Sequence, residues 1–312
     1  MTVMIEIRRI LCPIDFSDYS RRALDHAMAI ARWYGSTVTA LHVYSPTPVA
    51  ASYPGAVVLE PIVVTAVGRE ELLAQTKAFI EAEAVPGVRV EMVVRDGQAA
   101  AEIADMAISM NADLLVIGTH GRSGFERLLL GSVTEKVLRK ARCPVLTVPR
   151  RLPDAVPAGA VLYKRILCPV DFSASSLHAL KYATSLAQES DGQLTVLHVV
   201  SHEFENAVDK ANAVVAEERM TIGDFRRERE EALRRRLKDT VSRSDTEYCT
   251  AEGVVTHGKP WSEILRIASE RQSDLIVMGV QGRGAADLMF FGSTTQHVVR
   301  DATCPVLTLR RS

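Results

Sequence analysis

The chain lacks several features that would place it in other classes of protein. Its 37 lysine and arginine residues are balanced by 38 aspartate and glutamate residues, which gives a formal net charge of -1. This balance argues against nucleic acid as a partner, because binding to a phosphate backbone depends on an excess of basic side chains. No uninterrupted run of about 18 apolar residues is present, so the sequence predicts no membrane-spanning helix and no membrane partner.

Cysteine is also scarce. The chain has five cysteines and no C-x2-C pair, so neither a disulfide framework nor a zinc knuckle is predicted. Residues 1–9 lead directly into a strand pattern without a signal-peptide cleavage site. We therefore expect a cytoplasmic protein whose thiols are reduced.

The chain does contain an internal duplication. Residues 9–17 (RILCPIDFS) recur as residues 165–173 (RILCPVDFS), and the CPVLT sequence of residues 143–147 recurs at 304–308. A chain of 312 residues can form two cores. The proline-containing stretch between the copies is typical of a linker, so we predict two tandem domains, 1–154 and 155–312.

Strand and helix patterns alternate within each copy. Short apolar or β-branched runs predict strands, and apolar residues at helical spacing predict helices. In the first copy the strands are expected at residues 10–14, 38–43, 88–94, 113–117 and 145–148, and the helices at 20–34, 69–84, 99–110 and after 131. This alternation is typical of an α/β fold with a mainly parallel sheet, helices on both faces and ligands at the carboxyl ends of the strands.

A glycine-rich segment follows the fourth predicted strand of each copy. Both copies share the spacing G-x2-G-x9-G-S, which begins at Gly118 and at Gly279. Glycine lets a backbone approach a ligand closely, and the amides at the start of a helix favour phosphate. Four hydroxyl groups at the start of the following helices are predicted to donate hydrogen bonds to phosphate oxygens, namely those of Ser132, Thr134, Ser293 and Thr295.

The glycine spacing, together with the early P-[IV]-D-x-S segment, resembles the universal stress protein family over nearly the whole chain, twice. The resemblance implies Rossmann-like, adenine nucleotide alpha hydrolase-like domains with five strands each. It implies ATP, or ADP or AMP, as ligand, commonly with Mg²⁺ or Mn²⁺. Asp15 and Asp171 would contact the adenine, and the last strands of the two domains would pair as an intramolecular pseudo-dimer, with a further homodimer left open.

The expected binding residues are equivalent in the two copies. Those of the first are Pro13, Ile14, Asp15, Val43, Ile117, Gly118, His120, Gly121, Arg122, Gly131, Ser132, Val133 and Thr134. Those of the second are Pro169, Val170, Asp171, Val199, Met278, Gly279, Gln281, Gly282, Arg283, Gly292, Ser293, Thr294 and Thr295. The first is the safer site, because the second departs at Gln281 and at Ala285, which replaces Gly124.

No catalytic residue and no metal ligand from the protein is expected. His120 is interpreted as part of the phosphate side of the site. Cys12 with His42, and Cys168 with His198, suggest metal or thiol chemistry but lie within apolar runs, where buried structural residues are the favoured reading.

Three further segments are interpreted structurally. Residues 253–259 match the start of a P-loop, but Pro260 stands where a hydroxyl should bind Mg²⁺, so a strand-to-helix turn is predicted. Residues 225–239 alternate basic and acidic side chains, which predicts a solvated helix with i,i+4 ion pairs. Residues 45–68 are irregular and are expected to cover the nucleotide.

The leading hypothesis is an ATP-binding regulatory protein of the stress response, whose bound nucleotide stabilises a state that an unknown protein partner recognises. One alternative is a slow ATPase or a nucleotide-dependent transferase, which would need a positioned base or a metal-binding carboxylate that the sequence does not identify. A second alternative is an interaction scaffold with one or both sites inactive.

Overall fold

The structure is a computed structural model, and it describes residues 5–44, 48–53, 56–61, 66–121, 130–149, 163–201, 222–242, 250–280 and 292–310. The chain divides into two compact units, Glu6–Val161 and a unit that begins at Leu162. We refer to them as domain one and domain two. The expected boundary after residue 154 falls within residues 150–162, outside the described residues, so its position stays a prediction.

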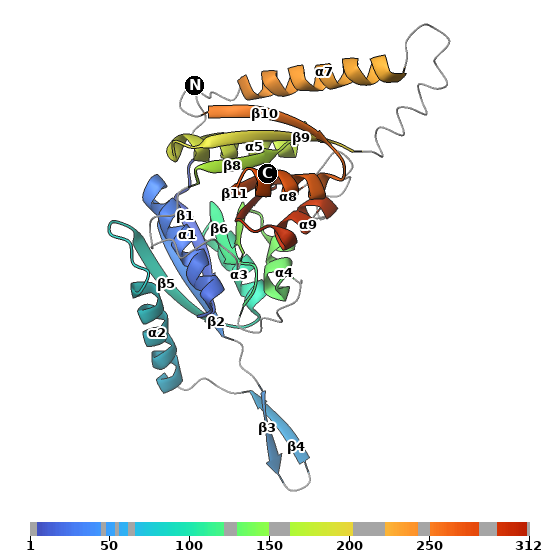
Figure 1. The fold of residues 1–312 in the computed structure, drawn as a ribbon. Helices are drawn as coiled ribbons and strands as arrows, with labels where there is room; N and C mark the ends of the chain where they lie inside the picture. Colours follow the sequence, from blue (N-terminus) through green and yellow to red (C-terminus); the bar gives the residue numbers. More distant parts are fainter. Residues whose placement is uncertain are drawn as a thin grey trace. The chain divides into compact units, whose positions relative to one another are not determined.

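Domain one is built on five parallel strands (Figure 1). These are β1 (Arg9–Ile14), β2 (Thr37–Tyr44), β5 (Arg89–Asp96), β6 (Leu114–Gly118) and β7 (Val145–Val148). They pair in the order β7-β6-β1-β2-β5. The strand order therefore reverses between β1 and β6, and this reversal leaves a crevice outside the carboxyl ends of the two strands.

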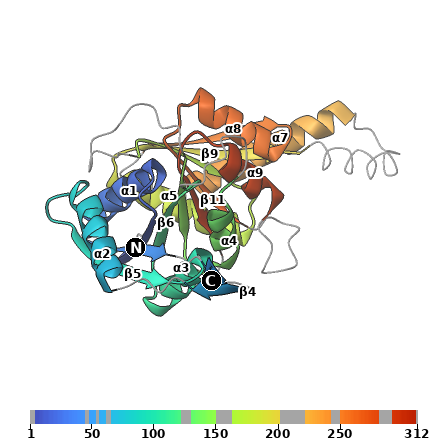
Figure 2. The same cartoon turned by 90° about the horizontal axis from the view of Figure 1, so that it is seen from below.

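Helices cover both faces of this sheet, with α1 and α2 on one face and α3 and α4 on the other (Figure 2). Their bounds are α1 (Asp18–Tyr34), α2 (Ala66–Glu81), α3 (Ala99–Ser109) and α4 (Ser132–Lys140). The first helix begins where the Ser17 hydroxyl accepts a hydrogen bond from the Ser20 amide at 3.2 Å. It ends at Gly35, whose φ of 64° is the left-handed conformation that favours glycine.

Domain two repeats this arrangement. Its strands β8 (Arg165–Pro169), β9 (Gln193–Val200), β10 (Thr250–His257), β11 (Leu275–Gly279) and β12 (Val306–Leu309) are parallel in the order β10-β9-β8-β11-β12. Its helices are α5 (Ala174–Glu189), α7 (Ile222–Ser242), α8 (Pro260–Glu270) and α9 (Ser293–Asp301). The register is duplicated as well, because Ile166 pairs with Leu194 as Ile10 pairs with Val38.

The expectation that residues 45–68 are irregular is wrong. This stretch contains β3 (Pro48–Tyr53) and β4 (Ala56–Pro61), which form an antiparallel hairpin, and α2 begins at Ala66. A signal was present in the sequence, because Pro54-Gly55 separates two apolar runs and such a dipeptide favours a turn. That this segment covers the nucleotide stays a prediction.

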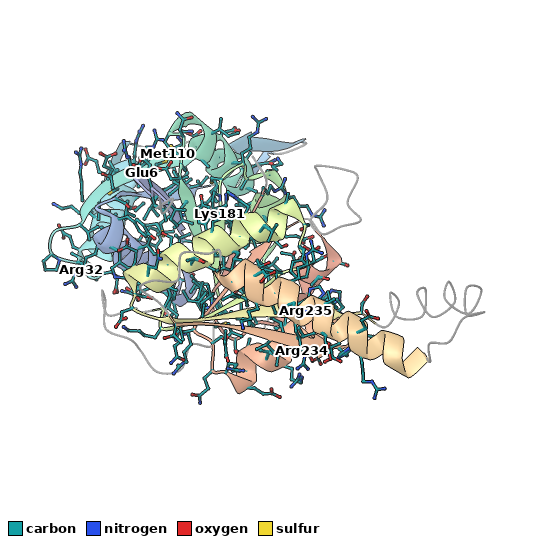
Figure 3. The ribbon with its side chains drawn as sticks, turned by 90° about the horizontal axis from the view of Figure 1, so that it is seen from above. Glu6, Arg32, Met110, Lys181, Arg234 and Arg235 are labelled. Atoms are coloured by element: carbon teal, nitrogen blue, oxygen red, sulfur yellow. The ribbon has the colours of Figure 1, made fainter. Side chains whose placement is uncertain are left out.

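The charged helix of domain two is confirmed, and α7 is longer than predicted. Arg234 and Arg235 project from it and are exposed (Figure 3), and Arg234 pairs with Glu230 at 2.6 Å. Leu237 of the same helix is buried and packs against Gly253 of β10. Over the described part of the chain, no helix combines the length and apolar character needed to cross a bilayer.

Candidate functional site

A cavity of about 290 Å³ lies in domain one at the carboxyl ends of β1, β2 and β6, where α3 and α4 begin. It is located where the strand order reverses, which is the usual ligand position in sheets of this topology. Its lining consists of Pro13, Ile14, Asp15, Ser20, Leu41, Val43, Ala99, Ile103, Ile117, Gly118, His120, Gly121, Gly131, Ser132, Val133 and Thr134.

This lining includes each described residue of domain one that the sequence predicted for the site, and Arg122 lies outside the described residues. Ser20 and three apolar residues of the lining were missed. Leu41 could have been predicted from the sequence, because it is two positions before Val43 and therefore lies on the same face of the strand. Likewise Ile103 follows Ala99 by one helical turn. Their part in binding stays a prediction.

Asp15 lies in the cavity wall, directly after β1. Its Oδ1 accepts hydrogen bonds from the amide of Ser17 at 3.1 Å and from the Ser17 hydroxyl at 2.5 Å. Its Oδ2 lies 2.6 Å from the position that a Cβ on Gly121 would occupy. The absence of a side chain at position 121 therefore leaves room for this carboxylate.

The turn that carries Asp15 is supported by aromatic rings. Phe16 has a φ of 64°, and its ring lies 4.4 Å from that of His42 between centroids. The Nδ1 of His42 lies 2.9 Å from the carbonyl oxygen of Ile14. Because a carbonyl only accepts, Nδ1 carries the proton and donates. His42 thus connects the end of β1 to β2, which confirms its interpretation as a buried structural residue.

The start of α4 forms part of the cavity wall. Gly131 is the N-cap residue, so the N-cap has no side chain of its own to accept a hydrogen bond from the first amides of the helix. The Gly131 amide itself donates to the carbonyl of Thr119 at 2.8 Å, which closes the loop onto the end of β6. The first amides of a helix have no acceptor within it and carry partial positive charge. Ser132 and Val133, the first two residues of α4, line the cavity, and an anion close to their amides would be stabilised.

The threonine hydroxyl at this helix has an acceptor within the protein. The hydroxyl of Thr134 donates to the carbonyl of Gly118 at 2.7 Å, and the side chain is buried. Thr134 therefore connects α4 to β6, and its role as a hydrogen-bond donor to phosphate stays a prediction.

The first glycine of the motif is also required by packing within the domain. A Cβ on Gly118 would lie 2.9 Å from the Cβ of Tyr19 and 3.1 Å from its backbone. The close approach between β6 and the first turn of α1 therefore requires glycine here, and a close approach of this backbone to a ligand stays a prediction. Gly131 is similar, because a Cβ there would lie 3.0 Å from the carbonyl oxygen of Thr119.

His120 lines the cavity between Gly118 and Gly121. Its Nδ1 lies 3.1 Å from the hydroxyl oxygen of Thr119. Its ring lies 5.4 Å from the ring of Tyr19 between centroids, at an interplanar angle of 38°. The side chain is therefore held from two sides.

Domain two repeats both the carboxylate turn and the helix start of this site. Asp171 Oδ1 accepts from the Ser173 amide at 3.0 Å and from its hydroxyl at 2.5 Å. The N-cap of α9 is Gly292, again without a side-chain cap, and its amide donates to the carbonyl of Val280 at 3.0 Å. The Thr295 hydroxyl donates to the carbonyl of Gly279 at 3.2 Å, as Thr134 does to Gly118, and its predicted role as a hydrogen-bond donor to phosphate likewise stays a prediction.

The remaining predicted residues of domain two lie at corresponding places. Pro169 ends β8 and Val170 follows it, Val199 lies near the end of β9, and Met278 and Gly279 end β11. The helix α9 begins with Ser293 and Thr294. Three predicted residues fall outside the described residues, namely Gln281, Gly282 and Arg283.

The cysteines and the P-loop-like segment that the sequence analysis interpreted as structural are structural features of the fold. Cys12 and Cys168 are fully buried, and burial raises the pKa of each thiol well above its usual range. The P-loop-like segment of domain two is a strand-to-helix turn, with Gly258 at a φ of 146° and Pro260 as the first residue of α8. Within the described ranges, no group of three or more His, Cys, Asp or Glu side chains is arranged to hold a metal ion.

Comparison with known proteins identifies the family. The sequence model of the universal stress protein family matches residues 6–149 and again residues 162–310. The chain belongs to the universal stress protein family. It is a tandem member, since both halves match separately.

Individual relatives agree with this assignment. Universal stress protein MJ0531 of Methanocaldococcus jannaschii is 37% identical over 142 residues, 45% of this chain and 81% of that protein. A universal stress protein of Mycolicibacterium smegmatis is 27% identical over 319 residues and covers 96% of both chains. A crystal structure of a universal stress protein from Archaeoglobus fulgidus has a TM-score of 0.67 at 24% identity, over 98% of this chain and 97% of that one, which supports the shared fold.

Proposed function

We propose that this tandem universal stress protein binds ATP in each domain and acts as a nucleotide-dependent regulator. One observation supports this proposal most directly. The cavity of domain one is lined by an oriented carboxylate, that of Asp15, and by the start of α4, whose N-cap residue Gly131 has no side chain. The carboxylate of Asp15 suits the hydrogen-bond donors of an adenine amino group or a ribose. The first amides of α4 suit the phosphates.

The residues present fit such a ligand. Ile14, Val43 and Ile117 line the same cavity, and their apolar side chains suit the flat ring of a base. Because the described residues offer no cluster of metal ligands, we propose that Mg²⁺ or Mn²⁺ would be held by the phosphates and by water. In domain two the same pattern of Asp171, Gly292 and the start of α9 supports a second site.

The residues that line the cavity favour ATP binding over rapid ATP hydrolysis. Asp15 and His120 are the titratable residues of the lining, and Asp15 is engaged by Ser17. General base catalysis needs a base within hydrogen-bond reach of the attacking water, usually oriented by a further group. Tight binding would instead stabilise the nucleotide-bound conformation for a protein partner to recognise.

The thiol groups that the structure describes give no second route to catalysis. Burial raises the pKa of Cys143 to about 11 and that of Cys304 to about 12, so both are protonated at neutral pH. A protonated thiol is a poor nucleophile. Cys12, Cys143, Cys168 and Cys304 are free cysteines, which supports the proposal of a cytoplasmic protein.

Purification without added nucleotide tests the function. The full-length protein is denatured, and released adenine compounds are identified by chromatography and mass spectrometry. ATP affinity and turnover are then followed with Mg²⁺. We expect bound adenine nucleotide, or saturable ATP binding, with little turnover. Absence of both retained nucleotide and measurable ATP affinity would contradict the proposal, and sustained turnover would favour the ATPase or transferase alternative.

A further inference from the structure

The side chain of His120 is fixed by two neighbours outside the cavity lining. Thr119 is buried and anchored by its backbone, since its amide donates to the carbonyl of Val148 at 2.9 Å. Its hydroxyl engages His120 Nδ1 at 3.1 Å. The ring of Tyr19, from the first turn of α1, lies 5.4 Å from the imidazole. Two elements of the fold therefore determine the orientation of one cavity residue.

This orientation decides which part of the imidazole a ligand meets. With Nδ1 engaged by Thr119, the second ring nitrogen, Nε2, is the one that remains for a ligand. His120 lines the cavity beside the start of α4, since a Cβ on Gly131 would lie 3.4 Å from the Cα of His120. A hydrogen bond from Nε2 would therefore be directed to the phosphate part of a nucleotide and not to its base.

Building on the proposed function, we infer that Tyr19 is a positioning residue. It holds His120 against the phosphates and so makes the affinity of domain one depend on the phosphate chain. Adenosine and AMP, which have few or no phosphates, gain less from this contact than ATP does.

Domain two differs at both positions. The residue equivalent to Tyr19 is Ser175, and the residue equivalent to His120 is Gln281. Ser175 is 5% exposed, and its hydroxyl finds no hydrogen-bond partner among the residues that the structure describes. No aromatic ring stands at position 175 to orient a neighbour. We therefore expect domain two to discriminate less between ATP and AMP.

Isothermal titration of the full chain carrying Gly282→Val, which disables the second motif, tests this inference. We expect Tyr19→Leu to weaken ATP binding by roughly tenfold and to change adenosine and AMP affinity by less than about twofold. Tyr19→Phe keeps the ring and should restore most of the ATP affinity. Tyr34→Leu, the same change at the other end of α1, is the matched control.

A double-mutant cycle separates positioning from a structural role. His120→Gln should weaken ATP binding as Tyr19→Leu does, and the double variant should be no weaker than His120→Gln alone. Three results would overturn the inference: additive losses of ATP affinity in the double variant, equal losses of affinity for adenosine and ATP, or failure of Tyr19→Phe to restore ATP affinity. In each case ATP binding by the parent would leave the proposed function intact. If the parent protein binds no ATP, the proposed function fails and the inference falls with it.

Discussion

Ser175 and Ser176 are neighbours at the start of α5, but their hydroxyl groups have different surroundings. The Ser176 hydroxyl donates to the carbonyl of Ser173 at 3.1 Å and accepts from the Asp171 amide at 3.2 Å. The Ser175 hydroxyl is buried and has no partner in the described part of the chain. A buried polar group without a partner costs free energy.

Replacing each serine by alanine should therefore have opposite effects on stability. We expect Ser175→Ala to raise the free energy of unfolding by about 1 kcal/mol, because it removes an unsatisfied hydroxyl. We expect Ser176→Ala to lower it by about 1 kcal/mol, because the Asp171 amide loses an acceptor. Urea unfolding of both variants measures the difference, and a loss of stability in Ser175→Ala would contradict the explanation.

Single contacts in the site were predictable from the sequence only when they were local. Asp15 could be placed at the cavity, because it directly follows an apolar strand and the carboxyl ends of parallel strands share one edge. The bond from Thr134 to Gly118 spans 16 residues and depends on how the intervening loop returns. The ring contact between Tyr19 and His120 joins residues about a hundred positions apart, and no spacing rule predicts it.

At the level of secondary structure elements, α1 and α2 are joined by a cluster of charged groups. Arg21 of α1 pairs with Glu83, just after α2, at 2.5 Å. Asp25 is hydrogen-bonded to the same glutamate, and its Oδ1 is buried without a partner within the described ranges. Burial first, and then the nearby Glu83, raises the pKa of Asp25 to about 7, although Arg21 and Arg22 oppose the shift.

This shift makes stability depend on pH. Between about pH 4 and pH 7 the folded protein holds a proton on Asp25 that the unfolded chain releases, so the stability contributed by this group falls as pH rises through that window. Asp25→Asn keeps a hydrogen-bonding group but carries no charge. We expect it to be more stable than the parent at pH 8, by about 1 kcal/mol since the group is partly hydrated, and equal near pH 4.

Thermal unfolding midpoints across this pH range measure the effect. The exposed Asp105, on α3, provides a matched control, since Asp105→Asn makes the same change at a surface position. A constant difference between Asp25→Asn and the parent at pH 4 and pH 8 would argue against the raised pKa of Asp25 as its cause.

Most strands and helices were predictable because their patterns are strong. The strands β1 and β6 are continuous apolar runs and are almost wholly buried, which fits a sheet covered on both faces. The bounds of α2 were misplaced by three residues at each end, since the predicted helix was 69–84 and the observed one is Ala66–Glu81. The hairpin β3-β4 was missed because weight was given to the prolines of the segment and not to the turn between its two apolar runs.

At the level of the whole molecule, the duplication predicts two binding events per chain. A Cβ on Gly121 would lie 2.6 Å from Asp15 Oδ2, so Gly121→Val should displace the carboxylate as well as narrow the cavity. Gly282→Val makes the equivalent change in the second copy. We expect each variant to retain about one ATP per chain where the parent binds two, and the double variant to bind none.

Equilibrium dialysis with labelled ATP counts the sites, and each single variant serves as the control for the other. ATP at about 100 times its Kd should stabilise a domain by about 2.7 kcal/mol through its intact site. An unchanged count in Gly282→Val would show that domain two does not bind, and would favour a protein with one active and one inactive half. Pairing of the domains through their last strands stays a prediction.

The packing of β6 against α1 bears on how the two halves diverged after the gene duplicated. Gly118 and Gly279 are required by their own domains, since a side chain there would strike the backbone of Tyr19 or Ser175. Selection for a folded protein alone would therefore preserve the first glycine of the motif, even in a copy that no longer bound nucleotide. Gly121 faces the carboxylate of the site, so substitutions at this second glycine are the ones that would record a loss of ligand binding during evolution.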